Sequence, residues 1–134
     1  MSANRRGVQL IWTDTYNAET AVTKYGFVIN GTNPNDAKLP TATGQRVLGI
    51  AMDNAAIGEP VEVVIVGRYW LIDMDGSLNI DDEVCTGDGA AEYHKGIIAT
   101  SSDIVVAIVE GSDEPSTADE LVLVRVGTTT HIKA

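Results

Sequence analysis

Residues 61–72 read VEVVIVGRYWLI, and this stretch decides the fold class. β-Branched residues dominate it, which is typical of strands rather than helices. Beyond Glu62 its first half is apolar on both faces, whereas a strand exposed on one side would alternate apolar with polar residues. The stretch therefore predicts a central strand that is covered on two sides, either by the rest of the fold or by a partner chain.

Short apolar runs of the same kind recur along the chain, and turn residues separate them. Gly, Asn and Pro occupy the intervals, as in Asn30-Gly31 and Asp75-Gly76, where they supply positive φ angles or end a strand. Turn signals at intervals of about ten residues are typical of antiparallel barrels and sandwiches. Residues 17–24, with Asn17 as a helix cap, are the one helical candidate. The predicted strands are Val8–Trp12, Tyr25–Asn30, Val47–Met52, Val61–Ile72, Glu83–Cys85, Ile104–Glu110 and Glu120–Val126.

The composition is that of a folded domain. The chain has 134 residues, of which 44% are hydrophobic and 21% charged, so it can bury a core of its own and fold as one unit. Its single cysteine, Cys85, excludes an internal disulfide. No apolar run follows Arg5 and Arg6, so we expect no signal peptide. No stretch of about 18 apolar residues occurs, so we expect neither a membrane span nor a membrane partner.

The negative charge is concentrated in the second half of the chain. The 19 Asp and Glu against 9 Lys and Arg give a formal net charge of −10. Residues 1–68 carry six side chains of each sign, whereas residues 69–134 carry three cationic and thirteen anionic ones, so the halves carry 0 and −10. Such a chain repels phosphate backbones, so we expect no nucleic-acid partner.

Catalytic and metal-binding patterns are weak throughout. No Gly-Lys dipeptide occurs, so the phosphate-binding loop of an ATPase is missing. Cys85 and His94 flank Asp88, but a small buried cysteine explains Cys85 more simply than a thiolate couple. Glu92 and His94 would share one face of an extended segment and supply two metal ligands without a third. We therefore expect no catalytic, cofactor-binding or metal-binding residues, and no enzyme.

The acidic segment 73–82, DMDGSLNIDD, has the alternation of a calcium-binding loop. When Gly76 takes the sixth position of an EF-hand, however, Leu71 falls on the first ligand and Asp82 on the twelfth, and the flanks are strands. The EF-hand interpretation therefore fails. A hairpin turn and a calcium site of another kind both remain open from the sequence.

An aromatic pair, Tyr69 and Trp70, directly follows Arg68 near the end of the decisive stretch. Aromatic residues beside arginine are enriched at protein interfaces, while an aromatic patch inside the core is an equal alternative. An apolar strand beside such a pair has surface to cover, and closed cyclic symmetry is a common solution. We expect a homotrimer whose subunits meet at Val64, Val66, Tyr69 and Trp70, and a dimer or a monomer is the next alternative.

From about Tyr25 to Val126 the chain resembles the small phage capsid decoration, or head cement, proteins, a group once described as predicted RecA/RadA-type recombinases. The resemblance depends on the order and spacing of short β-turn patterns. It departs from the family at Asp81, where the family prefers Gly, and at residues 114–119, where the last turn is longer. The matching pieces are Gly49-Ile50-Ala51, Gly58 to Val63, Gly67, Ile80 to Val84, Gly87 to Ala90, Val106 to Glu110 and Leu121 to Val126.

This resemblance implies a virion protein on the outer surface of an icosahedral head, with the major capsid protein as its partner. It leads us to expect an all-β, compact antiparallel β-barrel or β-tulip-like domain over residues 25–134. Residues 1–24 would form an extended N-terminal arm or a first strand, with Arg5 and Arg6 as capsid contacts. The alternative is a β-domain of a phage tail or host-recognition structure that grips carbohydrate or protein.

Overall fold

The computed structural model describes residues 11–111 and 117–134. All of the regular secondary structure in those ranges is β-strand. The prediction of an all-β fold is confirmed. The strands are β1 (Trp12–Ala18), β2 (Phe27–Asn30), β3 (Asp36–Lys38), β4 (Gly49–Ala51), β5 (Pro60–Ile72), β6 (Glu83–Thr86), β7 (Gly96–Ile98), β8 (Ile104–Val109) and β9 (Leu121–Ile132).

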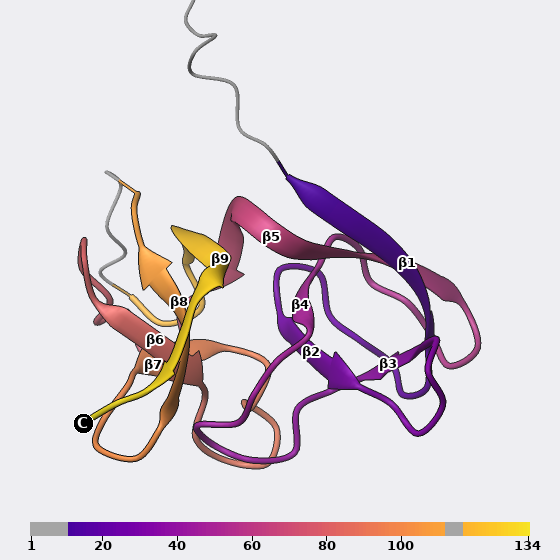
Figure 1. Cartoon of the computed structure of the whole chain (residues 1–134), viewed down its shortest axis with the longest axis horizontal. Coiled ribbons are helices and arrows are strands. Elements are labelled where there is room, and N and C mark those ends of the chain that lie inside the picture. The colour runs from indigo at the N-terminus through magenta and orange to yellow at the C-terminus, as the bar shows by residue number, and fades with distance from the viewer. Residues whose placement is uncertain (1–10, 112–116) are drawn as a thin grey trace, which may run out of the picture.

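The first half of the molecule is a closed barrel of five strands. Its order is β1-β3-β2-β4-β5, and β5 pairs back onto β1, with Tyr16 opposite Val61 and Trp12 opposite Val66. The β1–β3 pair is parallel and the other four pairs are antiparallel. Figure 1 shows these strands on one side of the molecule, with β5 running over the top.

The long strand β5 leaves the barrel and enters a second sheet. Gly67, with a φ angle of 131° that favours glycine, lies where the pairing of β5 changes from β1 to β9. The second sheet has the order β5-β9-β8-β6-β7. An isolated bridge between Asp73, just after β5, and Gly96 on β7 brings its two ends together. The prediction of a central strand is confirmed, and the protein's own fold covers both faces of its first half.

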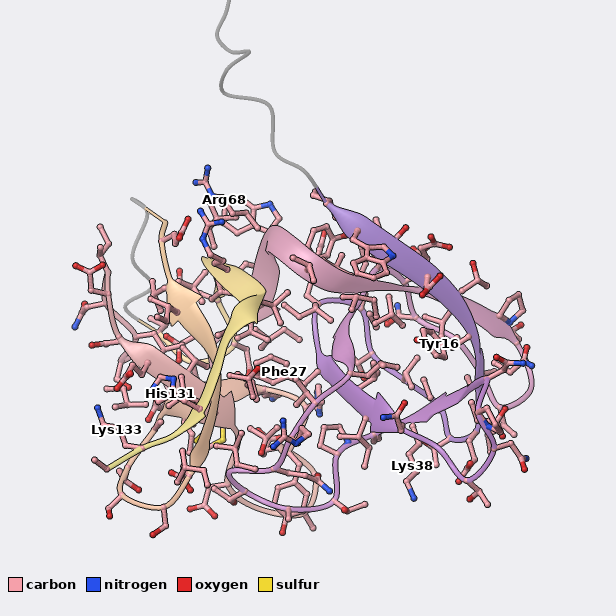
Figure 2. All side chains as sticks on the ribbon, viewed as in Figure 1. Tyr16, Phe27, Lys38, Arg68, His131 and Lys133 are labelled. Carbon is pink, nitrogen blue, oxygen red and sulfur yellow. The ribbon has the colours of Figure 1, made fainter. Side chains whose placement is uncertain are left out.

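The core is continuous across the two halves. One cluster joins Phe27, Ile50 and Val64 of the barrel to Leu71 and the inward valines of β8 and β9. Phe27, the only phenylalanine of the chain, is fully buried and lies at the centre of the molecule between the halves (Figure 2). A smaller cluster fills the barrel around Val28 and Val63. The halves are therefore packed as one unit.

The predicted helix at residues 17–24 is wrong. Asn17 and Ala18 belong to β1, and their backbone N–H groups donate to the carbonyls of Asn35 and Glu59 instead of entering a helix. Val22 then bridges to Ala55. Most of β1 was missed because its sequence, WTDTYNA, is largely polar and only Ala18 is fully buried. The strand predicted at Val8–Trp12 lies mostly outside the described residues.

Within the described ranges no helix could cross a membrane.

Candidate interaction surface

The neighbours Tyr69 and Trp70 lie on opposite faces of β5, because successive residues of a strand alternate. Tyr69 faces inward, is half-buried against the main core and contacts Tyr25 in a tilted arrangement, with 5.7 Å between the ring centroids. Trp70 faces outward and is 38% exposed. The pair therefore forms no joint aromatic platform.

The other two residues expected at a subunit interface differ in the same way. Val64 is fully buried inside the protein's own core, so it offers no surface to a partner. Val66 is half-buried and lies opposite the exposed Trp12 of β1. Of the four predicted residues, Trp70 presents the most outward surface.

Trp70 belongs to a larger surface built by β5 and β9. Its direct neighbour on β9 is Leu123, and Ile72 is likewise opposite Leu121, which is 38% exposed. Residues opposite one another in an antiparallel pair share a face. We call this surface the β5–β9 outer face; it comprises Arg68, Trp70, Ile72, Leu121, Leu123 and Arg125.

Two arginines lie side by side at one end of the outer face. Arg68 is directly opposite Arg125, and both contact the carboxylate of Glu110, just after β8. Arg125 donates from Nε at 2.5 Å and from Nη2 at 3.0 Å, and these bonds raise the pKa of its guanidinium. The buried Nε of Arg68 lies 3.1 Å from Oε1 without the alignment that a hydrogen bond needs. The single carboxylate of Glu110 therefore contacts both guanidinium groups. In Figure 2 Arg68 reaches the outside of the molecule, away from Phe27.

The acidic segment 73–82 is a turn held by its first residue. Asp73 is fully buried, and its carboxylate accepts N–H groups of Asp75, Gly76 and Leu78 at 3.3, 3.0 and 3.0 Å. Burial nevertheless raises the pKa of Asp73, and these hydrogen bonds oppose the rise. The exposed Asp75 accepts both the N–H and the hydroxyl of Ser77. These hydrogen bonds explain the segment as a turn without a cation, but the predicted hairpin turn is wrong, because the flanking strands β5 and β6 do not pair with each other.

The catalytic candidates are engaged elsewhere. Burial, with Asp103 nearby, raises the pKa of Cys85 to about 12, so its thiol is protonated at neutral pH. His94 packs against Gly26, and burial lowers its pKa. Glu92 forms an ion pair with Lys95 at 2.8 Å. In residues 11–111 and 117–134 no three His, Cys, Asp or Glu side chains gather as a metal site would require.

Comparisons with known proteins place the fold. No family model matches the chain, and no curated protein matches it. The structure is similar to the head fiber gp8.5 N base of bacteriophage phi29, with a TM-score of 0.65 and 12% sequence identity. The match covers 92% of this chain and 100% of that chain. At this identity the similarity concerns the fold.

Sequence reasoning missed most of the outer face. A signal was present in residues 121–126, where Leu121, Leu123 and Arg125 alternate with three valines. The structure turns the valines inward, where all three are buried, and the larger residues outward. It also missed the contacts of the Glu83 carboxylate with the imidazole of His131, at 2.9 Å, and with the ammonium group of Lys133, which join the end of β9 to β6. Figure 2 shows His131 and Lys133 near one another. Both lie about fifty residues from Glu83, so these contacts leave no local signal.

The predicted capsid contacts Arg5 and Arg6 lie outside the described residues.

Proposed function

We propose that the protein is a virion structural protein that decorates the outer surface of an icosahedral phage head and stabilises the shell. The observation that carries the proposal is the structural similarity to a phage head fiber base over 92% of the chain. The resemblance of residues 25–126 to capsid decoration proteins supports it independently. Cys85, the nucleophile considered from the sequence, is fully buried and its pKa is raised to about 12, which agrees with a non-enzymatic role.

The mechanism is stabilisation by mass action. A protein that binds only the assembled shell raises the free energy of disassembly by its own binding free energy. Many copies on symmetric sites add these contributions over the whole shell. The partner in this proposal is the major capsid protein, and the decoration protein itself is a homotrimer.

The charge distribution suggests an orientation on the shell. The balanced first half, with Arg5 and Arg6, would face the shell, where guanidinium groups bind carboxylates well. The acidic second half would face solvent, where like charges keep particles apart.

The alternative function is a module of a tail or host-recognition structure that grips carbohydrate or protein. An exposed platform of Tyr69 and Trp70 would favour it. These side chains lie on opposite faces of β5, and Tyr69 contacts Tyr25 in the half-buried interior, so the platform is lacking. We therefore rank this function second.

The test is binding to genome-filled heads of the phage that encodes the chain, stripped of this protein. Full-length protein should sediment with the heads and raise the temperature at which they release DNA. Replacing Arg5 and Arg6 with glutamine should weaken retention at low salt, whereas the control Lys95→Gln with Lys133→Gln, which removes two cations from the solvent-facing half, should not. Absence of the full-length protein from the head fraction at saturating concentration would refute the function. Equal retention of both double variants would refute only the role of Arg5 and Arg6.

A further inference from the structure

We infer that a second copy of this chain covers the β5–β9 outer face, through contacts of Trp70 and the two leucines together with ion pairs of Arg68 and Arg125. The inference rests on the self-association included in the proposed function and assigns its surface. Compared with the interface expected from the sequence, this surface leaves out Val64 and Tyr69, whose side chains face the core, and includes residues of β9.

The apolar part of the outer face is contiguous. Trp70 and Leu123 form one cross-strand pair and Ile72 and Leu121 the next, so four apolar side chains cover neighbouring positions of two paired strands. The opposite face of the same strands packs on the main core through Leu71 and the valines of β9. The sheet is thus apolar on both faces here, whereas a solvated outer face would alternate with polar residues. Contiguous exposed apolar surface marks interaction sites.

The cationic part calls for carboxylates from outside. Like charges directly opposite one another in a sheet are unfavourable, and Glu110 compensates only one of the two arginines. A carboxylate from outside that binds the exposed part of either guanidinium group would remove this imbalance. Arginine and tryptophan together are also the residue types enriched at the energetic centres of interfaces.

A second copy supplies both complements. The chain has a surplus of ten carboxylates, and Asp81 lies on the β6 side of β8, one strand away from the outer face. The backbone of Asp81 donates to the carbonyl of Val109 at 2.9 Å, which places this exposed residue next to the strand that leads to Glu110. Its neighbour Ile80 is 46% exposed. A second copy, rotated relative to the first, can therefore place its Ile80 and Asp81 against Trp70 and the two arginines.

Sedimentation equilibrium of the full chain at micromolar concentration tests the inference. The full-length protein should have a mass that is a multiple of 14.2 kDa. Trp70→Ser should reduce it to the monomer mass, and Arg68→Gln with Arg125→Gln should raise the dissociation constant at least about tenfold, as loss of desolvated charge pairs does. Salt at about 0.5 M should weaken association of the native protein more than that of the arginine variant.

Two matched controls separate the surface from general effects. Ile57→Ser removes an equally apolar, exposed side chain from a loop, and Lys38→Gln with Arg46→Gln makes the same charge change elsewhere. Both should leave the mass unchanged, and circular dichroism should confirm that every variant is folded. A native protein of monomer mass, or unchanged association in Trp70→Ser and the arginine variant, would overturn the inference. Association without head binding would overturn the decoration function while this inference stands.

Discussion

Replacing Asp73 with alanine should destabilise the protein strongly, because this carboxylate organises a turn from inside the core. Asp73 is fully buried and accepts three backbone N–H groups of residues 75–78. The last of these belongs to Leu78, which is itself fully buried in the main cluster. The backbone of Asp73 also forms the isolated bridge to Gly96, where the second sheet closes. Loss of the side chain therefore affects both the turn and the closure.

The magnitude follows from the three hydrogen bonds. The two bonds at 3.0 Å, to Gly76 and Leu78, are well formed, and leaving a buried N–H without an acceptor costs about 1–3 kcal/mol. The bond from Asp75 at 3.3 Å is weaker and lies nearer the surface. Part of this loss of stability is offset, because the alanine variant no longer buries a charged carboxylate. We expect a net loss of about 3 kcal/mol, which lowers the urea midpoint by about 1–2 M for a domain of this size.

Urea unfolding at pH 7, followed by tryptophan fluorescence, measures this loss. The matched control is Asp75→Ala, because Asp75 is exposed and its carboxylate binds only Ser77 among the hydrogen bonds described here. The control should change the unfolding free energy by about 0.5 kcal/mol or less, as surface substitutions do. Equal effects of the two substitutions would refute the reasoning.

The pH dependence of the same residue has a defined sign. Burial raises the pKa of Asp73 above the ordinary 3.8, so the folded state favours the protonated form. Its contribution to stability is therefore greatest below that ordinary value and is lost as pH rises through the folded pKa. The unfolding free energy of the native protein relative to Asp73→Asn should fall over this range, and a rise would contradict the assignment.

Three further substitutions and one reagent test other parts of the fold. Burial lowers the pKa of His94, so the native protein should lose stability as pH falls from 6.5 through the folded value; urea titrations of His94→Gln should lack this component. Gly49→Ala should cost more than about 3 kcal/mol or prevent folding, because its Cβ would lie 2.0 Å from the carbonyl oxygen of Val64. Gly58→Ala, with a φ of 88° but nothing within 4 Å, should cost only about 1 kcal/mol by the same denaturation assay. Cys85, whose pKa burial raises to about 12, should react with a thiol reagent only after unfolding, and fast labelling of the native protein would refute its burial.

The strands that could be predicted from the sequence are those that contain a run of apolar residues, because such a run indicates a buried strand without knowledge of its partners. The decisive stretch became β5, and Ile104–Glu110 became β8 with one residue less. The three-residue strands β3 and β7 were missed because such short segments carry no periodicity, although each pairs with the strand directly before it in the chain. The polar strand β1 was missed because it contributes few apolar residues to the core.

The candidate surface was predictable only in part, for a related reason. Trp70 drew attention as an exposed aromatic beside Arg68, but its partner Leu123 lies about fifty residues away. Pairing at that distance depends on the closure of the whole sheet, which no local pattern encodes. The opposite orientations of Tyr69 and Trp70, by contrast, follow from strand alternation alone.

The double closure of the sheets bears on how the protein behaves when crowded. Unpaired strand edges are templates for aggregation and strand exchange between neighbours. In the described residues every strand except β7 has a partner on both sides, and the bridge from Asp73 already occupies Gly96 on the free side of β7. The edges that stay open in these residues are short segments: residues 97–98 of β7, residues 12–16 of β1, which pair with β5 alone, and residues 68–71 of β5, which pair with β9 alone. Copies packed at high density can therefore touch through side chains while their backbones have few and short segments at which strands could be exchanged.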